Sequence, residues 1–120
     1  MIYLASPYSH KDADIREARF IAVSKAAAYY LKRGRLVFCP IAMSHPIAVH
    51  GDMEGDWQTW QRLDMHMLNL CCKFIILGLD GWMTSKGVNA ERAGAQLLGM
   101  KIETVFPGAI GVPNVPLEQD

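Results

Sequence analysis

The chain has 120 residues, which is enough for one compact domain with a buried core and too few for a second domain. Hydrophobic residues make up 51% and charged residues 20%, a composition that excludes a disordered chain. The 12 Lys and Arg residues are balanced by 12 Asp and Glu residues, so neither net charge nor a basic cluster favours a nucleic-acid polymer as partner.

The N-terminus does not look like a targeting segment. Residues 1–5 lack the basic region and apolar stretch of a signal peptide, and no apolar run approaches the length that crosses a bilayer. We therefore expect a cytoplasmic protein with no membrane partner. Cys39, Cys71 and Cys72 are too few for a paired disulfide framework and lack zinc-type spacing, so we expect reduced thiols.

The first half of the chain is predicted to contain two strands and one long helix. Short apolar runs at 2–6 and 35–39 predict the strands, and small and apolar residues at helical spacing predict a helix over 12–33. The solvated start of this helix is expected to comprise four charged residues, Asp12, Asp14, Arg16 and Glu17. Residues 41–54 show no sustained period, which predicts a long loop of the kind that often carries function.

The second half continues the alternation of helices and strands. In chain order the sequence predicts a helix over 56–71, a central strand over 74–79, a turn over 80–86, a helix over 87–98 and a strand over 101–106. The run at 74–79 is the most apolar in the chain and is typical of a strand buried on both faces. Prolines and glycines from Pro107 onward predict an extended C-terminal segment.

Alternating strands and helices of these lengths predict one α/β domain over 1–120, with a core over 1–106 and an extended segment over 107–120. The expected architecture is a flavodoxin-like or Rossmann-like three-layer fold, in which helices cover both faces of a parallel sheet. Ligands of such sheets bind at the carboxyl ends of the strands, where the strand order reverses. Candidate site residues are therefore sought after each strand.

Asp64 interrupts the apolar side of the predicted helix over 56–71. The residues at steps of three or four along this side are Trp57, Trp60, Asp64, Met67, Leu68 and Cys71. Burial would raise the pKa of this carboxyl group and suit it to general acid catalysis. Pairing with an arginine or capping of a loop explains the pattern equally well. The helical spacing of Trp57, Trp60, Met65 and Met67 favours places in the core over a cofactor site.

Glu91 lies in the first turns of the predicted helix over 87–98. It shares a face with Val88 and Ala95, so it is expected to point towards the sheet. Two inward carboxylates on separate elements suit displacement at an anomeric carbon, where one attacks and the other handles the proton of the leaving group. The alternative is a glutamate favoured by the helix dipole. Gly87, just after Ser85, allows the backbone to approach a ligand closely.

The histidines do not predict a metal site. His45 and His50 share the expected loop with Asp52 and Glu54, but their spacing matches no zinc pattern. We expect no metal and no cofactor. His45 is assigned to substrate binding instead, because it lies in the loop that is expected to carry function.

The sequence resembles a known superfamily at several of these positions. Residues 2–5, the segment around Asp64 and above all residues 85–91 (SKGVNAE) resemble the nucleoside 2-deoxyribosyltransferases, which include the deoxynucleoside monophosphate N-glycosidases. Residues 40–48, the two tryptophans at 57 and 60, and the Gly81-Trp82 pair resemble a small bacterial and phage family within that superfamily, a family of unestablished function.

The resemblance implies a flavodoxin-like fold and a double displacement without cofactor. Glu91 matches the glutamate that attacks C1′ of the sugar, and Asp64 matches the aspartate associated with protonation of the base. Tyr3 matches a tyrosine beside the nucleophile, whereas Ser6 and Ser85 match residues that contact the sugar or its phosphate. Members often complete their sites with a neighbouring subunit, which implies a homo-oligomer, with Asn114 as a donor to the neighbouring site. The substrate would be a nucleoside or a nucleoside 5′-monophosphate, cleaved by water or by a second base.

The sequence also departs from the superfamily pattern. Asn89 and Ala93 replace glycines around the glutamate, and Arg92 stands where a leucine is common. Residues 7–10 hold no arginine where the monophosphate hydrolases have one, which leaves open whether the ligand carries a phosphate. These departures motivate a second hypothesis, in which the fold serves as a non-catalytic nucleotide-binding or sensing module.

Overall fold

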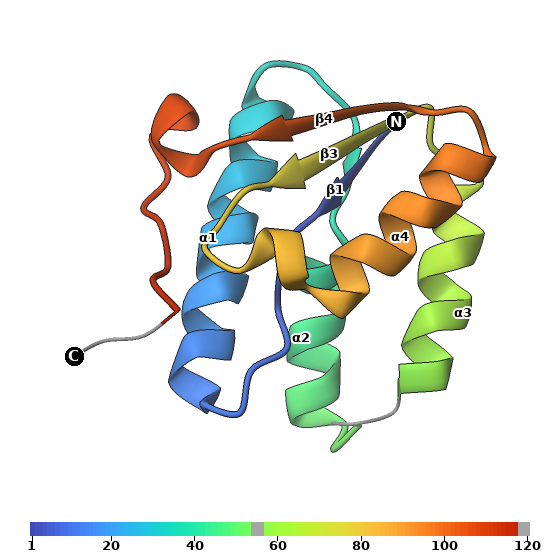
Figure 1. The fold of residues 1–120 in the computed structure, drawn as a ribbon. Helices are drawn as coiled ribbons and strands as arrows, with labels where there is room; N and C mark the ends of the chain where they lie inside the picture. The colour runs from blue at the N-terminus through green and yellow to red at the C-terminus, as the bar shows by residue number, and fades with distance from the viewer. Residues whose placement is uncertain (54–56, 118–120) are drawn as a thin grey trace.

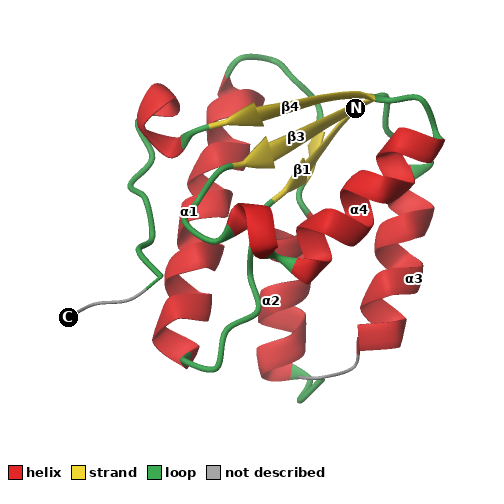
Figure 2. Ribbon diagram, in the orientation of Figure 1, coloured by secondary structure: helices red, strands yellow, loops and turns green. Residues whose placement is uncertain are grey.

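The computed structural model describes residues 1–53 and 57–117 and shows a parallel sheet between two layers of helices (Figure 1). The strands are β1 (Ile2–Ala5), β2 (Val37–Phe38), β3 (Lys73–Leu77) and β4 (Lys101–Val105). The helices are α1 (Ala13–Lys32), α2 (Pro40–His50), α3 (Trp57–Leu68) and α4 (Lys86–Leu97). Two short 3-10 helices, η1 (Trp82–Thr84) and η2 (Pro107–Ile110), follow β3 and β4 (Figure 2). The predicted α/β three-layer fold is confirmed.

The strand order is β2-β1-β3-β4, with every neighbouring pair parallel. This order is that of flavodoxin-like folds, which begin 2-1-3-4, and it differs from the 3-2-1-4 order of Rossmann folds. The chain leaves β1 towards β2 on one side and later returns to pair β3 on the other side of β1. The order therefore reverses between β1 and β3, and their carboxyl ends, at Ala5 and Leu77, mark the expected ligand site.

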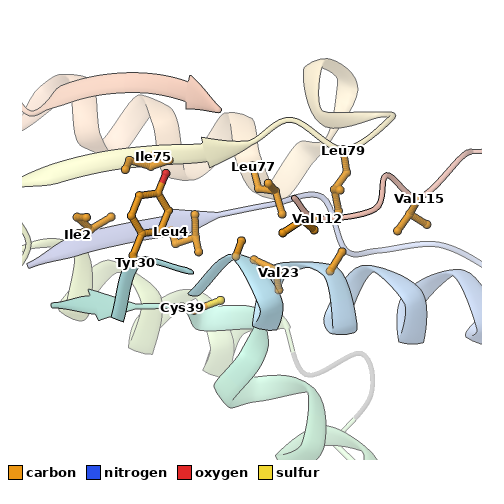
Figure 3. Close-up of a cluster of buried hydrophobic side chains, with 12 residues drawn as sticks. Ile2, Leu4, Val23, Tyr30, Cys39, Ile75, Leu77, Leu79, Val112 and Val115 are labelled. Atoms are coloured by element: carbon orange, nitrogen blue, oxygen red, sulfur yellow. The ribbon is translucent and has the colours of Figure 1, made fainter. Parts of the chain in front are cut away.

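Side-chain alternation along β1 assigns its residues to two separate cores. Ile2 and Leu4 face α1 and join a cluster with Val23, Ile75 and Leu77 (Figure 3). Tyr3 and Ala5 face the opposite side and pack with residues of α3, β3 and α4. Successive side chains of a strand point to opposite faces, so this division follows from the strand itself. Tyr3 is thereby directed at the layer formed by α3 and α4.

A side chain caps the N-terminus of α1, and another caps the N-terminus of α4. Asp12 accepts a hydrogen bond from the backbone N of Asp14 at 2.8 Å, and Ser85 accepts one from Val88 N at 3.2 Å. Gly34, with φ of 76°, follows α1 in the left-handed conformation that commonly ends a helix. No helix within the described ranges is long and apolar enough to cross a bilayer.

The prediction of a loop over 41–54 is wrong, because residues 40–50 form α2. Pro40 stands at the first helical position, where a missing N–H costs no hydrogen bond. Pro46 lies inside the helix, where proline normally disrupts the hydrogen-bond ladder, and its presence favoured the loop prediction. The expected end of this loop at Glu54 and the expected start of the next helix at Asp56 lie outside the described residues.

The segment after β4 is more ordered than predicted. Residues 107–110 form η2, and Val112 and Val115 are buried in the cluster on the α1 side of the sheet (Figure 3). The Oδ1 atom of Asn114 accepts a hydrogen bond from the backbone N of Asp80 at 3.1 Å. The C-terminal segment therefore packs on its own chain, where Asn114 satisfies a backbone donor. Residues 118–120 of the predicted extended segment lie outside the described residues.

Candidate active site

A cavity of about 800 Å³ opens at the carboxyl ends of β1 and β3, where the strand order predicts a ligand site. Its lining comes from the loop after β1, from α1, α2 and α3, and from the segment between η1 and the first turns of α4. Its volume is within the range of small-molecule sites. The α3 and α4 layer lies on one side of the sheet and α1 on the other, so the cavity has two differently built walls (Figure 1).

Tyr3 supports Glu91 from beneath the cavity. Tyr3 is fully buried in β1, and its Oη atom donates a hydrogen bond to Oε2 of Glu91 on α4. Burial and the nearby charges of Glu91 and Asp64 raise the pKa of Tyr3 far above its ordinary value, so the phenol remains a donor. Its ring is stacked on Phe74 of β3, with ring centroids 5.5 Å apart. The sheet therefore fixes one oxygen of the Glu91 carboxyl group.

Glu91 and Asp64 both line the cavity, and burial makes both carboxyl groups harder to ionise. Burial raises the pKa of Glu91 to about 8; the Tyr3 hydrogen bond lowers it and the charge of Asp64 raises it. Burial raises the pKa of Asp64 to about 6. The Oδ1 atom of Asp64 is buried and accepts no hydrogen bond within the described part of the chain. Both inward orientations that the sequence predicted are present.

Because both pKa values are raised, this pair shares one proton near neutral pH. Between about pH 6 and pH 8 the pair holds one proton, because one carboxyl group has ionised and the other has not. The ionised group is able to attack an electrophilic carbon while the protonated group donates to a leaving group. The Tyr3 hydrogen bond stabilises the anionic form of Glu91, which favours Glu91 as the attacking group.

Four of the five residues predicted to bind substrate line the cavity, namely Ser6, Ser85, Gly87 and His45, whereas Tyr3 is not part of the lining. Ser6 is buried, and its Oγ atom has no hydrogen-bond partner among the described residues. The Oγ atom of Ser85 caps α4 and thereby fixes the helix that carries Glu91. A Cβ atom placed on Gly87 would meet no other atom of the described residues within 4 Å, so packing against them does not require a glycine here.

His45 belongs to a chain of hydrogen bonds between α1, α2 and the loop after β1. Its Nε2 atom lies 2.7 Å from Oε2 of Glu17, and its Nδ1 atom lies 2.6 Å from Oη of Tyr8. The carboxylate accepts only, so Nε2 is the donor and a neutral ring accepts from Tyr8 through Nδ1. Phe20 stacks on the imidazole at a centroid distance of 4.3 Å. The Glu17 side chain remains 54% exposed, as expected at the solvated start of the helix, while it hydrogen-bonds to His45.

Sequence reasoning missed several cavity residues on α1 and in the loop after β1. Arg16 and Arg19 line the cavity from α1, and Tyr8 lines it from the loop. Arg16 was expected to be solvated, but it points inward and donates to the backbone oxygen of His10 at 2.5 Å. Arg19 is only 3% exposed. Its position four residues after Ile15, on the apolar side of the helix, was the signal that could have revealed it.

Trp60 was predicted as core and lines the cavity instead. It lies one helical turn before Asp64 on α3 and is partly exposed, as is Met65 beside it. Ile41 of α2 adds a further apolar side chain to the lining. The Asp64 side chain thus shares the cavity lining with apolar and aromatic side chains, and its raised pKa is caused by burial.

A family model described as a domain of unknown function, DUF1937, matches residues 1–106. The chain belongs to this family. The region shared with the DUF1937 family contains the whole sheet, all of α1 to α4 and the residues Tyr3, Asp64 and Glu91. It ends where β4 gives way to η2. No curated protein sequence matches the chain significantly.

Three of the positions where the sequence departs from the deoxyribosyltransferase pattern are absent from the cavity lining, whereas residues 7–10, the fourth departure, belong to it. Asn89, Arg92 and Ala93 are on α4 near Glu91, and none of these three described side chains contributes to the lining. The amide of Asn89 donates to the backbone oxygen of Met83 at 3.2 Å, on the exposed side of the helix. The side chains of Asn89, Arg92 and Ala93 therefore do not shape the described lining around Glu91.

Proposed function

We propose that the chain cleaves the N-glycosidic bond of a nucleoside or nucleoside 5′-monophosphate through a glycosyl ester on Glu91. The observation that carries the proposal is the cluster of Tyr3, Glu91 and Asp64 at a cavity of substrate size. It combines a carboxylate fixed by a buried phenol with a second carboxyl group of raised pKa. Water or a second base accepts the sugar, which makes the enzyme a hydrolase or a transferase.

The proposed reaction has two displacements at C1′ of the sugar. In the first, a Glu91 oxygen forms a bond to C1′ while the bond from C1′ to the base nitrogen breaks. The electron pair of the broken bond leaves with the base, and the base takes a proton from Asp64. In the second, water or another base attacks C1′, Asp64 takes up the proton of the attacking group, and the Glu91 carboxylate is released. Each proton that Asp64 gives in the first step returns in the second.

The surroundings of Asp64 suit a planar base. Trp60, Met65 and Ile41 supply flat or flexible apolar surface, and Gln61 of the same helix adds an amide to the lining. A base held against this wall would place its glycosidic nitrogen beside the proton donor. The motif over residues 85–91 and the resemblance to nucleoside 2-deoxyribosyltransferases support the same reaction. We also propose, on that resemblance, a cytoplasmic homo-oligomer without cofactor or metal.

Base release from purified protein tests the proposal. The protein is incubated with nucleosides and with their 5′-monophosphates, with and without an acceptor base, and free or exchanged base is measured by chromatography. We expect release from at least one substrate and a loss of about a thousandfold or more in Glu91→Gln. Glu103→Gln, which removes a carboxylate of β4 paired with Lys73 at 3.2 Å, is the matched control and retains activity.

Two results would contradict the proposal: no base released from any substrate, or undiminished release by Glu91→Gln. Mass spectrometry of protein quenched during turnover gives an independent readout. A sugar adduct on the peptide that contains Glu91 is expected, and an adduct on another residue would assign the nucleophile elsewhere.

A second candidate function is a nucleotide-binding module without turnover. It is favoured by one observation, the pKa of about 8 that burial gives Glu91, because a carboxyl group that keeps its proton at neutral pH is a poor nucleophile. Ligand-dependent thermal stabilisation without base release would establish this function. Base release would exclude it.

A further inference from the structure

The guanidinium group of Arg19 is a buried cation on the α1 side of the cavity. Its side chain is 3% exposed and lines the cavity. Its Nη1 atom donates to the backbone oxygen of Ser9 at 3.0 Å, and Nη2 lies 3.4 Å from the backbone oxygen of Asp80. These two carbonyl groups hold the guanidinium in place, and neither neutralises its charge.

No carboxylate compensates this charge within the described ranges 1–53 and 57–117. The basic side chains that contact carboxylates there are His45, with Glu17, and Lys73, with Glu103, and Arg19 takes part in neither contact. Its Nε atom is buried and lacks a hydrogen-bond partner among these residues. Burying an arginine without a counter-ion or a full set of acceptors is costly, so such groups are normally paired. The pKa of Arg19 is lowered by this burial, as expected for a cation with no anionic neighbour.

Two further groups of the cavity lining complement Arg19. Arg16, one turn earlier on α1, brings a second guanidinium to the lining. Ser6, at the end of β1, contributes a buried hydroxyl group that also lacks a partner among the described residues. A cation with a free Nε donor, a second cation and a free hydroxyl group form a set of donors that suits the oxygens of a phosphate group.

The backbone near Arg19 is shaped to admit the guanidinium. Gly81 adopts a positive φ of 91°, and a Cβ atom at this position would lie 3.2 Å from Nη2 of Arg19 and 2.9 Å from a methyl group of Leu117. A side chain there would push against the guanidinium and Leu117. The glycine thus keeps open the corner in which Arg19 lies.

We propose that Arg19, with Arg16 and Ser6, forms a phosphate subsite, so that the ligand of this cavity is a phosphate monoester of a nucleoside rather than the free nucleoside. This proposal rests on the proposed function for the nucleoside part of the ligand. The arrangement of the walls supports it. Trp60 and Asp64 line the cavity from α3, on one side of the sheet, and the arginines line it from α1, on the other side. A nucleotide has the same division, with the base at one end and the phosphate at the other.

Binding measurements on a variant that cannot turn over its ligand test the subsite separately from catalysis. The Glu91→Gln variant is titrated calorimetrically with nucleosides and with the corresponding 5′-monophosphates. In a second experiment, its melting temperature is measured in inorganic phosphate and in sodium chloride of equal ionic strength. We expect each monophosphate that binds to do so about tenfold or more tightly than its nucleoside. Phosphate alone should stabilise the protein beyond the chloride control.

Two substitutions of Arg19 identify the source of this preference. Arg19→Met keeps the length and the apolar stem and removes the charge, so the preference for the monophosphate should fall to about twofold or less. Arg19→Lys keeps the charge without the planar fork and should retain part of the preference. Lys25→Gln, an exposed position of α1 outside the cavity lining, is the matched control and should retain all of it. Circular dichroism confirms that each variant is folded, and Arg16→Gln gives a second readout if Arg19→Met does not fold.

Equal binding of nucleoside and monophosphate would overturn the proposal, as would an unchanged preference in folded Arg19→Met or, should that variant not fold, in Arg16→Gln. These outcomes are distinguishable from failure of the proposed function. A protein that prefers monophosphates but never releases base retains the subsite and loses the catalytic proposal. A protein that cleaves nucleosides and monophosphates equally well retains the catalytic proposal and loses the subsite.

Discussion

Glu91 and Asp64 carry the same functional group, and the fold gives them different surroundings. Glu91 receives a hydrogen bond from the buried phenol of Tyr3, whereas the Oδ1 atom of Asp64 has no partner among the described residues. The hydrogen bond lowers the pKa of Glu91, but burial and the charge of Asp64 raise it by more. The reactive state, with Glu91 ionised and Asp64 protonated, is therefore one of two ways in which the pair holds a single proton.

The first prediction concerns the pH dependence of base release. Below about pH 6 both carboxyl groups are protonated and no nucleophile exists, and above about pH 8 both are ionised and no acid exists. We expect a bell-shaped profile of kcat/KM with limbs near these values. Tyr3→Phe removes the donor to Glu91, so it should lower the rate throughout and move the alkaline limb upward. A flat profile between pH 5 and pH 9 would contradict this assignment of the pair.

The second prediction concerns stability against pH. The pKa of Glu91 is raised from 4.5 to about 8 in the folded chain, so its contribution to stability is fully present below about pH 4.5 and is lost as the pH rises through about 8. Glu91→Gln removes the buried charge. We expect this variant to match the native chain at pH 5 and to exceed it by about 1–3 kcal/mol at pH 9, measured by urea unfolding. Glu103→Gln should show no such gain.

At the scale of elements, α4 brings the nucleophile to the end of β1. Ser85 ends the segment after β3 and caps the helix through Val88 N, and Glu91 follows in the second turn. The inward face of α4 is anchored by Val88 and Ala95, both buried against the sheet. The position of the Glu91 carboxyl group thus depends on where the helix begins and on how closely it packs.

The third prediction tests this cap. Ser85→Ala removes the side-chain acceptor for Val88 N and should lower the free energy of unfolding by about 0.5–2 kcal/mol. Ser85→Asp retains an acceptor at the start of the helix and should preserve most of the stability. Urea unfolding of both variants makes the comparison. Equal losses in the two variants would show that the hydroxyl group has a role other than capping.

For the whole molecule, the C-terminal segment completes the core on the α1 side of the sheet. Val112 and Val115 are buried beside Val23 and Leu79, and Asn114 satisfies the backbone of Asp80 after β3 (Figure 3). Leu117 reaches the cavity lining near Gly81. The family match ends at residue 106, and yet the chain beyond it covers apolar surface of the matched domain.

The fourth prediction follows from this packing. A chain that ends at Phe106 exposes the surface under Val112 and Val115 and should lose about 3 kcal/mol or more of stability, because each buried valine contributes about 1.5 kcal/mol or more. The double substitution Val112→Ala and Val115→Ala in the full chain should reproduce part of this loss. Denaturant unfolding measures both. A shortened chain as stable as the full one would show that the segment merely lies on the surface.

The sequence by itself determined the four strands, the helices α1, α3 and α4, the three-layer fold class and the inward faces of Asp64 and Glu91. These features follow from the periods of 2 and 3.6 residues, which depend on neighbours along the chain. The stop at Gly34 is local for the same reason, whereas the cap that Ser85 provides was found only in the structure. The roles of Glu91 and Asp64 in a reaction came from the resemblance and await the experiments above.

Only the tertiary structure decided the features that depend on residues far apart in the chain. Contacts of α2 with α1 and with β1 support a helix at Pro46, where the local pattern predicted a loop. Arg19 became a buried cation because the loops after β1 and β3 close over it, and its charge is uncompensated among the described residues. The pKa values of Glu91 and Asp64 depend on burial, which no local sequence pattern measures. Local periodicity therefore predicted where the cavity lies, whereas desolvation and contacts between distant residues determine the charges and pKa values of its side chains.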